Sequence, residues 1–354
     1  MADTGVRCFP LRRWTLALAL TCVPALAPAV HADDFYAGKT INLIISTNSG
    51  GGLDTNARVI ARHLPNHIPG KPLIVPMNMP GAGALRAANF LYNVAPKDGT
   101  TLGTLIPAFV LAQVVGRSGV QYDAAKFGWI GSTSSSNDGI YAWSSSGVKS
   151  IDDAFHREIL MGATGAGSYS TLYPTVLNNV IGTRFKVVPG YGDVGNVNIA
   201  MQRGEVEGRA GGNLSTIRAT NPQWFSDRLI TLLVQIGVKR DRQFPDVPLM
   251  IELGKTHEQR EVFRLFSTDV VIGRALAAPP GMPAERLALL RKAFEDMLAD
   301  PEFLKEEAAV RLEVEPMSGA EVQKYVDGMV HTPADIVALG KAAMVAKDAA
   351  KRGN

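Results

Sequence analysis

Three glycine-rich turns, each leading into a predicted helix, carry the clearest chemistry of this sequence. They lie at residues 50–52, 81–83 and 165–167. Glycine lets a backbone approach a ligand closely, and the free N–H groups and dipole of a helix N-terminus favour negative charge. One such turn is most often a tight connection, but three in one chain indicate a site for a small anion.

The first two turns do not fit a nucleotide-binding motif. The segment GAGALRAA, at 81–88, has the G-x-G of a dinucleotide motif but lacks its third glycine. The segment GGGLDTNA, at 50–57, lacks the Lys-Ser/Thr pair of a phosphate-binding loop. We therefore expect no nucleotide and no other cofactor.

Patterns for metal binding and catalysis are also missing from the sequence. His63 and His67 are four residues apart, but Pro65 lies between them and should break a helix. No G-x-S-x-G motif or close pair of carboxylates suggests a nucleophile or an acid–base pair. The sequence predicts neither a metal site nor an enzyme.

Several side chains near the turns suit either a structural or a binding role. Asp54 is a candidate N-cap of the first helix or a ligand contact, and Arg86, one turn into the second helix, is a surface residue or a partner for a carboxylate. Ser168 and Ser170 are helix caps or hydroxyl donors. Asn213 follows two glycines at a predicted strand end, where a polar pocket residue is expected.

The elements around the turns follow one repeated order. The run TINLIIS, at 40–46, is apolar enough for a strand buried on both faces, and Ala57, Ile60, Ala61 and Leu64 then recur at helical spacing. The same strand–glycine–helix order returns at 72–92 and at 159–182. This order is typical of doubly wound α/β sheets, which bind ligands outside the carboxyl ends of their strands.

Residues 1–32 have the features of a secretory signal peptide. Three arginines precede an apolar stretch at 14–30, and VHA provides a small-residue cleavage site after Ala32. A membrane anchor is the alternative, but the stretch is short and contains two prolines. Both cysteines lie in this segment, so the mature chain has no disulfide. Its charge is nearly balanced without a dense basic run, and nucleic acid is not an expected partner.

Several segments, in this order, resemble the Bug-type extracytoplasmic solute receptors of the tripartite tricarboxylate transporters. The resemblance covers essentially all of the mature chain. It is most specific at NMPGAGALRAANFLYNVAPKDGTTLGTL and LAAPPGMPAERLALLRKAFEDMLADPEF, and it continues through MGATGAGSYSTL and VPGYGDVGNVNIAMQRGEVEGRAGG.

This resemblance implies a two-lobed periplasmic binding protein of the Venus-flytrap kind, with each lobe a doubly wound α/β sheet flanked by helices. We expect lobe 1 at 33–140 plus 270–354 and lobe 2 at 141–269. The implied function is to capture a small carboxylate between the lobes, in the periplasm, and to deliver it to a membrane permease. We expect a monomer. A sensor subunit for a membrane kinase is an alternative, and a periplasmic enzyme on the same fold is a weaker one.

The resemblance also implies which loops contact the ligand, largely through backbone amides and ordered water. This sequence departs from the family pattern there, with STNSGGG at the first turn and Ala84-Leu85-Arg86 after the second. An additional arginine at 86 would suit a second carboxylate of the ligand. The expected binding residues are Ser49, Gly50, Gly51, Asp54, Gly81, Ala82, Gly83, Ala84, Arg86, Thr164, Ser168, Tyr169, Ser170, Tyr191 and Asn213.

Overall fold

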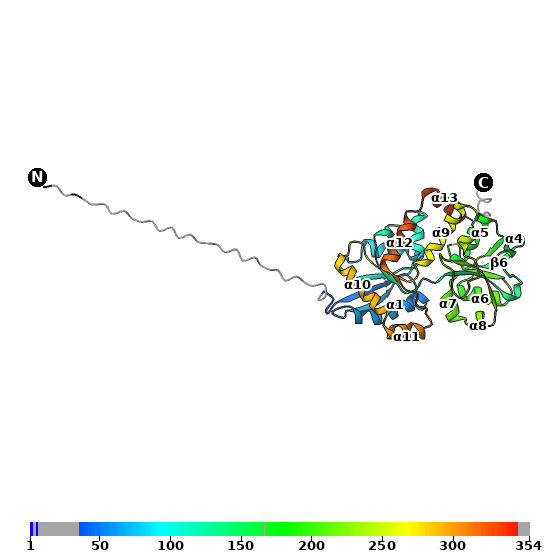
Figure 1. Cartoon of the computed structure of the whole chain (residues 1–354), viewed down its shortest axis with the longest axis horizontal. Helices are drawn as coiled ribbons and strands as arrows, with labels where there is room; N and C mark the ends of the chain where they lie inside the picture. Colours follow the sequence, from blue (N-terminus) through cyan, green and yellow to red (C-terminus); the bar gives the residue numbers. More distant parts are fainter. Residues whose placement is uncertain (3–4, 6–34, 166, 346–354) are drawn as a thin grey trace. The chain divides into compact units, whose positions relative to one another are not determined.

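The computed structural model describes residues 1–2, 5, 35–165 and 167–345 (Figure 1). Apart from three residues, the predicted signal peptide at 1–32 lies outside the described residues. The described residues from Phe35 onwards form one compact unit. Within the described ranges, no helix has the length and apolarity needed to cross a membrane.

Two mixed sheets form the framework of this unit. The first has six strands in the order β11-β4-β10-β3-β1-β2. Strands β1, β2 and β3 are parallel, as the repeated strand–glycine–helix order predicts, whereas β10 runs antiparallel to both β3 and β4. Its strands are β1 (Thr40–Ile45), β2 (Leu73–Asn78), β3 (Thr101–Thr104), β4 (Gly128–Ser132), β10 (Ala275–Ala278) and β11 (Met317–Ser318).

The second sheet has five strands in the order β7-β6-β8-β5-β9. Strand β6 is parallel to β7 and β8, and β5 is antiparallel to β8 and β9. The strands are β5 (Asp138–Trp143), β6 (Ile159–Gly162), β7 (Phe185–Val188), β8 (Gly208–Asn213) and β9 (Ile230–Ile236). Both sheets are flanked by helices, which confirms the predicted α/β class.

The α-helices occupy the connections between strands and the C-terminal part of the chain. They are α1 (Gly52–His63), α2 (Leu85–Asn93), α3 (Ala108–Val114), α4 (Asp153–His156), α5 (Tyr169–Ile181), α6 (Val194–Gln202), α7 (Leu214–Thr220), α8 (Gln223–Ser226), α9 (His257–Val271), α10 (Ala284–Leu298), α11 (Pro301–Ala309), α12 (Gly319–Val330) and α13 (Ala334–Ala343). Several pack on the sheets, as α5 does on β8 and α12 on β4, whereas α11 and α13 pack mainly on other helices.

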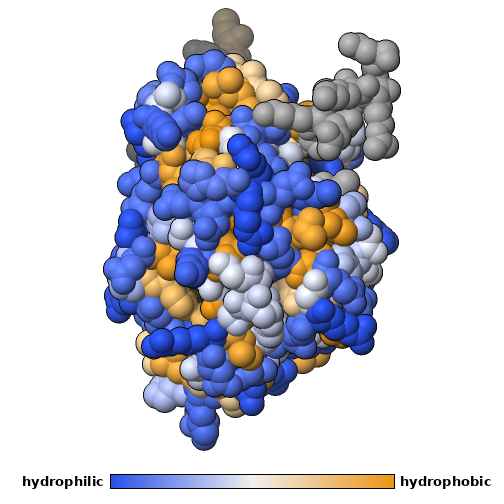
Figure 2. All heavy atoms as spheres, turned by 90° about the vertical axis from the view of Figure 1, so that its right-hand side faces the viewer, coloured by the Kyte–Doolittle hydropathy of each residue, from blue (hydrophilic) through white to orange (hydrophobic). Residues whose placement is uncertain are grey.

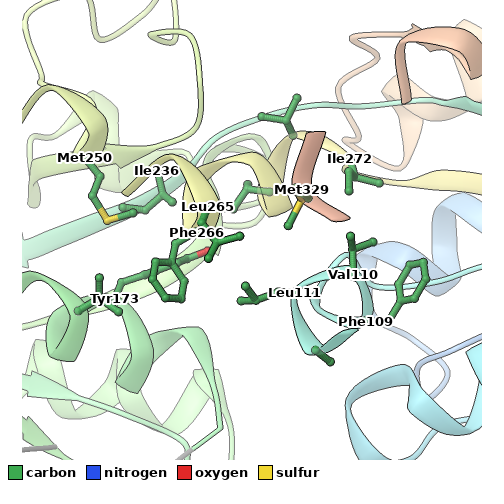
Figure 3. Close-up of a cluster of buried hydrophobic side chains, with 14 of the residues drawn as sticks. Phe109, Val110, Leu111, Tyr173, Ile236, Met250, Leu265, Phe266, Ile272 and Met329 are labelled. Atoms are coloured by element: carbon green, nitrogen blue, oxygen red, sulfur yellow. The ribbon is translucent and has the colours of Figure 1, made fainter. Parts of the chain in front are cut away.

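A hydrophobic cluster lies where α3, α9 and α12 pack together (Figure 3). Phe109 and Leu111 of α3 contribute to it, as do Phe266 of α9 and Met329 of α12, and all four are almost fully buried. Tyr173 of α5, in the second sheet's layer, belongs to the same cluster. The surface in Figure 2 is mostly hydrophilic, with small separate hydrophobic patches.

The chain passes from the first sheet to the second between β4 and β5, at residues 133–137. It returns through α9, which lies between β9 and β10. Residue 140 lies within β5, a strand of the second sheet. The division into lobes at 33–140 plus 270–354 and 141–269 stays a prediction.

Candidate binding site

The third glycine turn joins β6 to α5 and is held by side-chain hydroxyls. Thr164 donates its backbone N–H to the Ser170 hydroxyl over 3.2 Å. The hydroxyls of Ser168 and Thr171 donate to the carbonyl oxygen of Gly165, over 2.8 and 2.7 Å. Ser168 is the N-cap residue of α5, but its side chain accepts no capping bond from the helix backbone, and its hydroxyl lies 2.7 Å from that of Ser170. These bonds fix the turn at the start of α5.

A cavity of about 390 Å³ lies beside this turn. Its wall comes from the start of α5, the end of β8, and residues of α6 and α7. The structure therefore brings together predicted residues that are far apart in the sequence. The predicted residues in the wall are Thr164, Ser168, Tyr169, Ser170 and Asn213.

Arg209 of β8 also lines the cavity, and the sequence reasoning missed it. Only 4% of its surface is exposed. Within the described part of the chain, its guanidinium forms no hydrogen bond and no ion pair of 4.0 Å or less, and its Nε is buried without a partner. The guanidinium carbon lies 5.1 Å from the centre of the Tyr141 ring. A buried cation with free N–H donors can pair with an anion that enters the cavity.

Glycine at 212 makes room for this arginine. A Cβ at Gly212 would lie 2.8 Å from Nη2 of Arg209, and the residue has a φ of +96°, which other residues rarely adopt. The segment GRAGGN, at 208–213, could have indicated Arg209 as a binding residue. An arginine flanked by small residues within a strand has few neighbouring side chains that separate it from a ligand.

A buried network of two tyrosines and two aspartates lies behind the cavity wall. The hydroxyl of Tyr169 donates to Asp269 of α9, and that of Tyr173 donates to Asp138 of β5 over 3.3 Å. The two tyrosine rings stack with centroids 5.0 Å apart. Burial raises the pKa of Asp269 to about 7 and that of Asp138 to about 6. The Tyr169 hydroxyl is therefore already bonded, although its residue lines the cavity.

The first glycine turn is closed by Asp54. Helix α1 begins at Gly52 with Gly51 as its N-cap, so the expectation that Asp54 caps the helix is wrong. The Asp54 carboxylate accepts from the N–H of Gly50, from Arg58 and from Asn78, over 2.8 to 3.0 Å. Burial raises its pKa, but these bonds outweigh burial and lower the pKa to about 2. The Asp54 carboxylate is thus ionised and already hydrogen-bonded within the turn.

The first turn lies next to the cavity wall without lining the cavity itself. Arg274, which immediately precedes β10, donates from Nη2 to the hydroxyl of Thr216 over 3.1 Å. Thr216 belongs to α7 and lines the cavity. A Cβ at Gly52 would lie 3.8 Å from both the Arg274 Nη2 and the Thr216 hydroxyl. The start of α1 and the cavity thus meet at Thr216.

The second glycine turn has an unusual backbone and does not line the cavity. All four residues at 81–84 have a positive φ, including Ala82 at +50° and Ala84 at +73°. Glycine adopts such a φ freely, but at Ala82 and Ala84 it costs on the order of 1 kcal/mol per residue, and such strain is typical of functional loops. Arg86 is exposed and its side chain lies against Gly81. Tyr191 lies near Gly162 of β6, also outside the cavity wall.

Five of the expected binding residues thus share the cavity wall, and the others lie outside it. A ligand role for those others stays a prediction. They are Ser49, Gly50, Gly51, Asp54, Gly81, Ala82, Gly83, Ala84, Arg86 and Tyr191.

The fold has several solved relatives. The periplasmic binding protein BugD is 21% identical, with a TM-score of 0.60 over 88% of this chain and 99% of that one. A Rhodopseudomonas palustris protein with adipate is 22% identical, with a TM-score of 0.61 over 87% and 98%. Another from the same organism, with bound malate, is 20% identical, with a TM-score of 0.60 over 84% and 99%. At these identities the likeness shows the fold, that of two-lobed periplasmic binding proteins.

Sequence comparisons agree with this fold. A UPF0065 protein of Cupriavidus necator is 27% identical over 315 residues, which are 85% of this chain and 86% of that protein. A family model described as the tripartite tricarboxylate transporter family receptor matches residues 56–339. The match covers more than half of the chain, and the chain therefore belongs to this family of solute-binding receptors, which includes the Bug-type proteins.

Proposed function

We propose that the chain is a periplasmic receptor that captures a small carboxylate in the cavity beside α5 and delivers it to a tripartite transporter permease. The signal peptide directs its export through the inner membrane to the periplasm and is cleaved after Ala32, and the mature chain works there as a monomer without a cofactor. Its role is capture and delivery, with no turnover of the ligand.

The observation that carries this proposal is the guanidinium of Arg209, which is buried in the cavity wall and has no hydrogen-bond partner among the described residues. A buried guanidinium whose N–H donors have no acceptor is costly, and a carboxylate is the natural partner for the planar N–H donors of arginine. The N-terminus of α5 opens onto the same cavity and favours negative charge as well. The related structures with adipate and malate support a carboxylate.

The two connections between the sheets support a closing motion around the ligand. The segment at 133–137 and the connection through α9 join the two sheets. A ligand that contacts both sides of such a junction favours the closed state through its higher affinity for it. We propose that closure presents the loaded receptor to the permease.

The binding proposal is tested by thermal and chemical unfolding of the mature chain, from Asp33, with a panel of carboxylates. The panel holds dicarboxylates, tricarboxylates, amino acids and aromatic acids, with phosphate and sulfate as controls. A ligand at about 100 times its Kd should add about 2.7 kcal/mol to the free energy of unfolding. Denaturing mass spectrometry of the purified protein first identifies any acid retained from the host.

Matched variants test whether stabilisation by the carboxylate depends on Arg209. Arg209→Gln should abolish stabilisation by the active carboxylate, because it removes the cation of the cavity wall. Arg203→Gln, at an exposed arginine of the same lobe, should leave stabilisation unchanged. The proposal fails if no carboxylate stabilises the protein and none is retained from the host. Uptake of the labelled acid by cells with and without the gene tests delivery to a permease.

A further inference from the structure

Two carboxylates are buried behind the cavity wall. Asp138 begins β5, is 7% exposed and accepts from the Tyr173 hydroxyl over 3.3 Å. Asp269, near the end of α9, is fully buried and accepts from the Tyr169 hydroxyl. Neither carboxylate forms an ion pair of 4.0 Å or less with a described residue, and Oδ1 of Asp269 is buried without a hydrogen-bond partner in that part of the chain. The negative charge of either group, when ionised, is therefore weakly compensated.

The charge of Arg209 acts on Asp138 from the neighbouring strand. Strands β5 and β8 are antiparallel neighbours, and Tyr141 of β5 is paired with Arg209 of β8. Gly212 adjoins both charged side chains: a Cβ there would lie 2.8 Å from Nη2 of Arg209, and its backbone N–H lowers the pKa of Asp138 through a hydrogen bond. Burial raises the pKa of Asp138 to about 6, against the lowering effects of its hydrogen bonds and of the Arg209 charge. Asp138 and an anion in the cavity thus share Arg209 as a counter-charge.

The other ionisable groups around the two carboxylates are tyrosines. Burial raises the pKa of each of them, so they stay neutral near pH 7; they are Tyr122, Tyr141, Tyr169 and Tyr173. The carboxylates also act on each other, because burial and then the charge of Asp138 raise the pKa of Asp269, to about 7. No ionisable side chain of 250–253, α12 or α13, which pack on α9, shifts the pKa of either carboxylate, and β9, α3 and α6 carry none.

The two carboxylates lie at the two connections between the sheets and next to the cavity. Asp138 directly follows the segment at 133–137, and Asp269 belongs to α9, the returning connection. Tyr169 lines the cavity, and its ring stacks on that of Tyr173 with centroids 5.0 Å apart. Because these tyrosines hold the two carboxylates, a charge that enters the cavity acts on groups at both connections.

We propose that the receptor takes up a proton when it captures a carboxylate, and that the proton resides on the buried pair of Asp138 and Asp269. This rests on the proposed function. The ligand pairs with Arg209 and withdraws its charge from Asp138, which leaves a buried anion beside a second one. A proton from the solvent then forms one O–H bond on the pair, and because the two groups interact it belongs to the pair and not to one residue. The bound state holds more protons, so a lower pH favours capture and a higher pH favours release.

Calorimetry at pH 7 in PIPES and in Tris, which differ in ionisation enthalpy, measures the uptake of protons on binding. The probe is the acid that most stabilises the mature wild-type chain among malate, adipate, glutamate, benzoate and any acid retained from the host; the carboxyl groups of the four named acids are ionised from pH 7 upwards. A rise of about one unit in the pKa of one buried carboxylate should give about 0.4 proton per bound acid. The affinity should then fall about fourfold from pH 7 to pH 8.5.

The outcomes separate this inference from the proposed function. Binding without proton uptake, with an affinity independent of pH, would overturn the inference, while the binding itself upholds the proposed function. Binding of none of these acids would overturn both. The comparison of buffers uses the wild-type chain, so it does not depend on whether a variant folds.

Variants assign the proton to the pair. A chain with both Asp138→Asn and Asp269→Asn should bind the acid without proton uptake, because an amide cannot ionise but still accepts from the tyrosine hydroxyls. Glu307→Gln is the matched control: Glu307 is also buried, with its pKa raised by burial to about 7, but it lies in α11 and accepts from Asn56. This control should keep the full uptake. Unchanged uptake in the double variant, with folding verified by circular dichroism, or loss of uptake in Glu307→Gln would overturn the inference.

Discussion

Replacing Asp269 with asparagine should remove much of the pH dependence of stability. Asp269 is fully buried in α9, and burial together with the charge of Asp138 raises its pKa to about 7. It accepts a hydrogen bond from the Tyr169 hydroxyl, which an asparagine oxygen can also accept. The other titratable groups around it are the hydroxyls of Tyr173 and Tyr122.

The sign follows from proton binding. Between about pH 4 and pH 7, native Asp269 holds a proton that the unfolded chain has released, so stability falls as the pH rises through this window. A rise of the pKa from 3.8 to about 7 corresponds to about 4 kcal/mol lost by pH 8. Asparagine cannot ionise, so the variant avoids this loss. Its stability relative to the wild type should therefore increase by up to about 4 kcal/mol between pH 4 and pH 8.

Urea unfolding at half-unit steps from pH 4 to pH 8 measures this difference. Asp246→Asn, at an exposed aspartate, is the matched control and should give a constant offset at all pH values. Asp138 and Glu307 keep their own raised pKa values in both proteins, so a smaller slope remains in the variant. A difference between Asp269→Asn and wild type that stays constant across the range would refute the reasoning, because it would show that Asp269 is ionised in the native state at low pH.

Three further changes test the turns and the cavity. Gly212→Ala should weaken carboxylate binding more than tenfold, since the new Cβ would lie 2.8 Å from Arg209; Gly147→Ala, which also has a positive φ but open space, is the control in calorimetry. Asp54→Ala should lower the free energy of unfolding by about 2–4 kcal/mol at pH 7, because three hydrogen bonds to a carboxylate are lost. Since its pKa is lowered to about 2, this difference should shrink as the pH falls from 4 to 2, and a pH-independent difference would count against it. Arg86→Ala tests the ligand contact predicted from the sequence. If Arg86 contacts the ligand, the affinity should fall about tenfold, and an unchanged affinity would show that Arg86 is not part of the site.

The sequence predicted those parts of the fold that depend on local patterns. Apolar runs followed by glycine and a helical stripe correspond to β1 with α1, β2 with α2, and β6 with α5. It did not predict that β10 inserts antiparallel between β3 and β4. That pairing joins residues more than 140 positions apart, and a strand of four small or apolar residues carries no signal for its direction.

The candidate site was likewise predictable only where its residues follow a local pattern. Hydroxyl and amide residues beside a glycine turn are recognisable locally, and the cavity wall contains Thr164, Ser168, Ser170 and Asn213. Arg209 and Arg274 were missed because an arginine in a sequence is ordinarily a surface residue. Their burial depends on neighbours from distant segments, namely Tyr141 in β5 for Arg209 and Thr216 in α7 for Arg274.

The two arginines also explain how ligand binding and stability are connected in this chain. Each guanidinium is buried with a donor nitrogen that no described residue accepts from, which costs folding free energy in the absence of an anion. A carboxylate that enters the cavity removes part of that cost at Arg209, so binding should stabilise the fold. Arg274 immediately precedes β10 of the first sheet and donates to Thr216 of α7, which follows β8 of the second sheet, so its hydrogen bond links the two sheets beside the cavity. Capture of the ligand and stabilisation of the fold would then result from the same ion pair at Arg209.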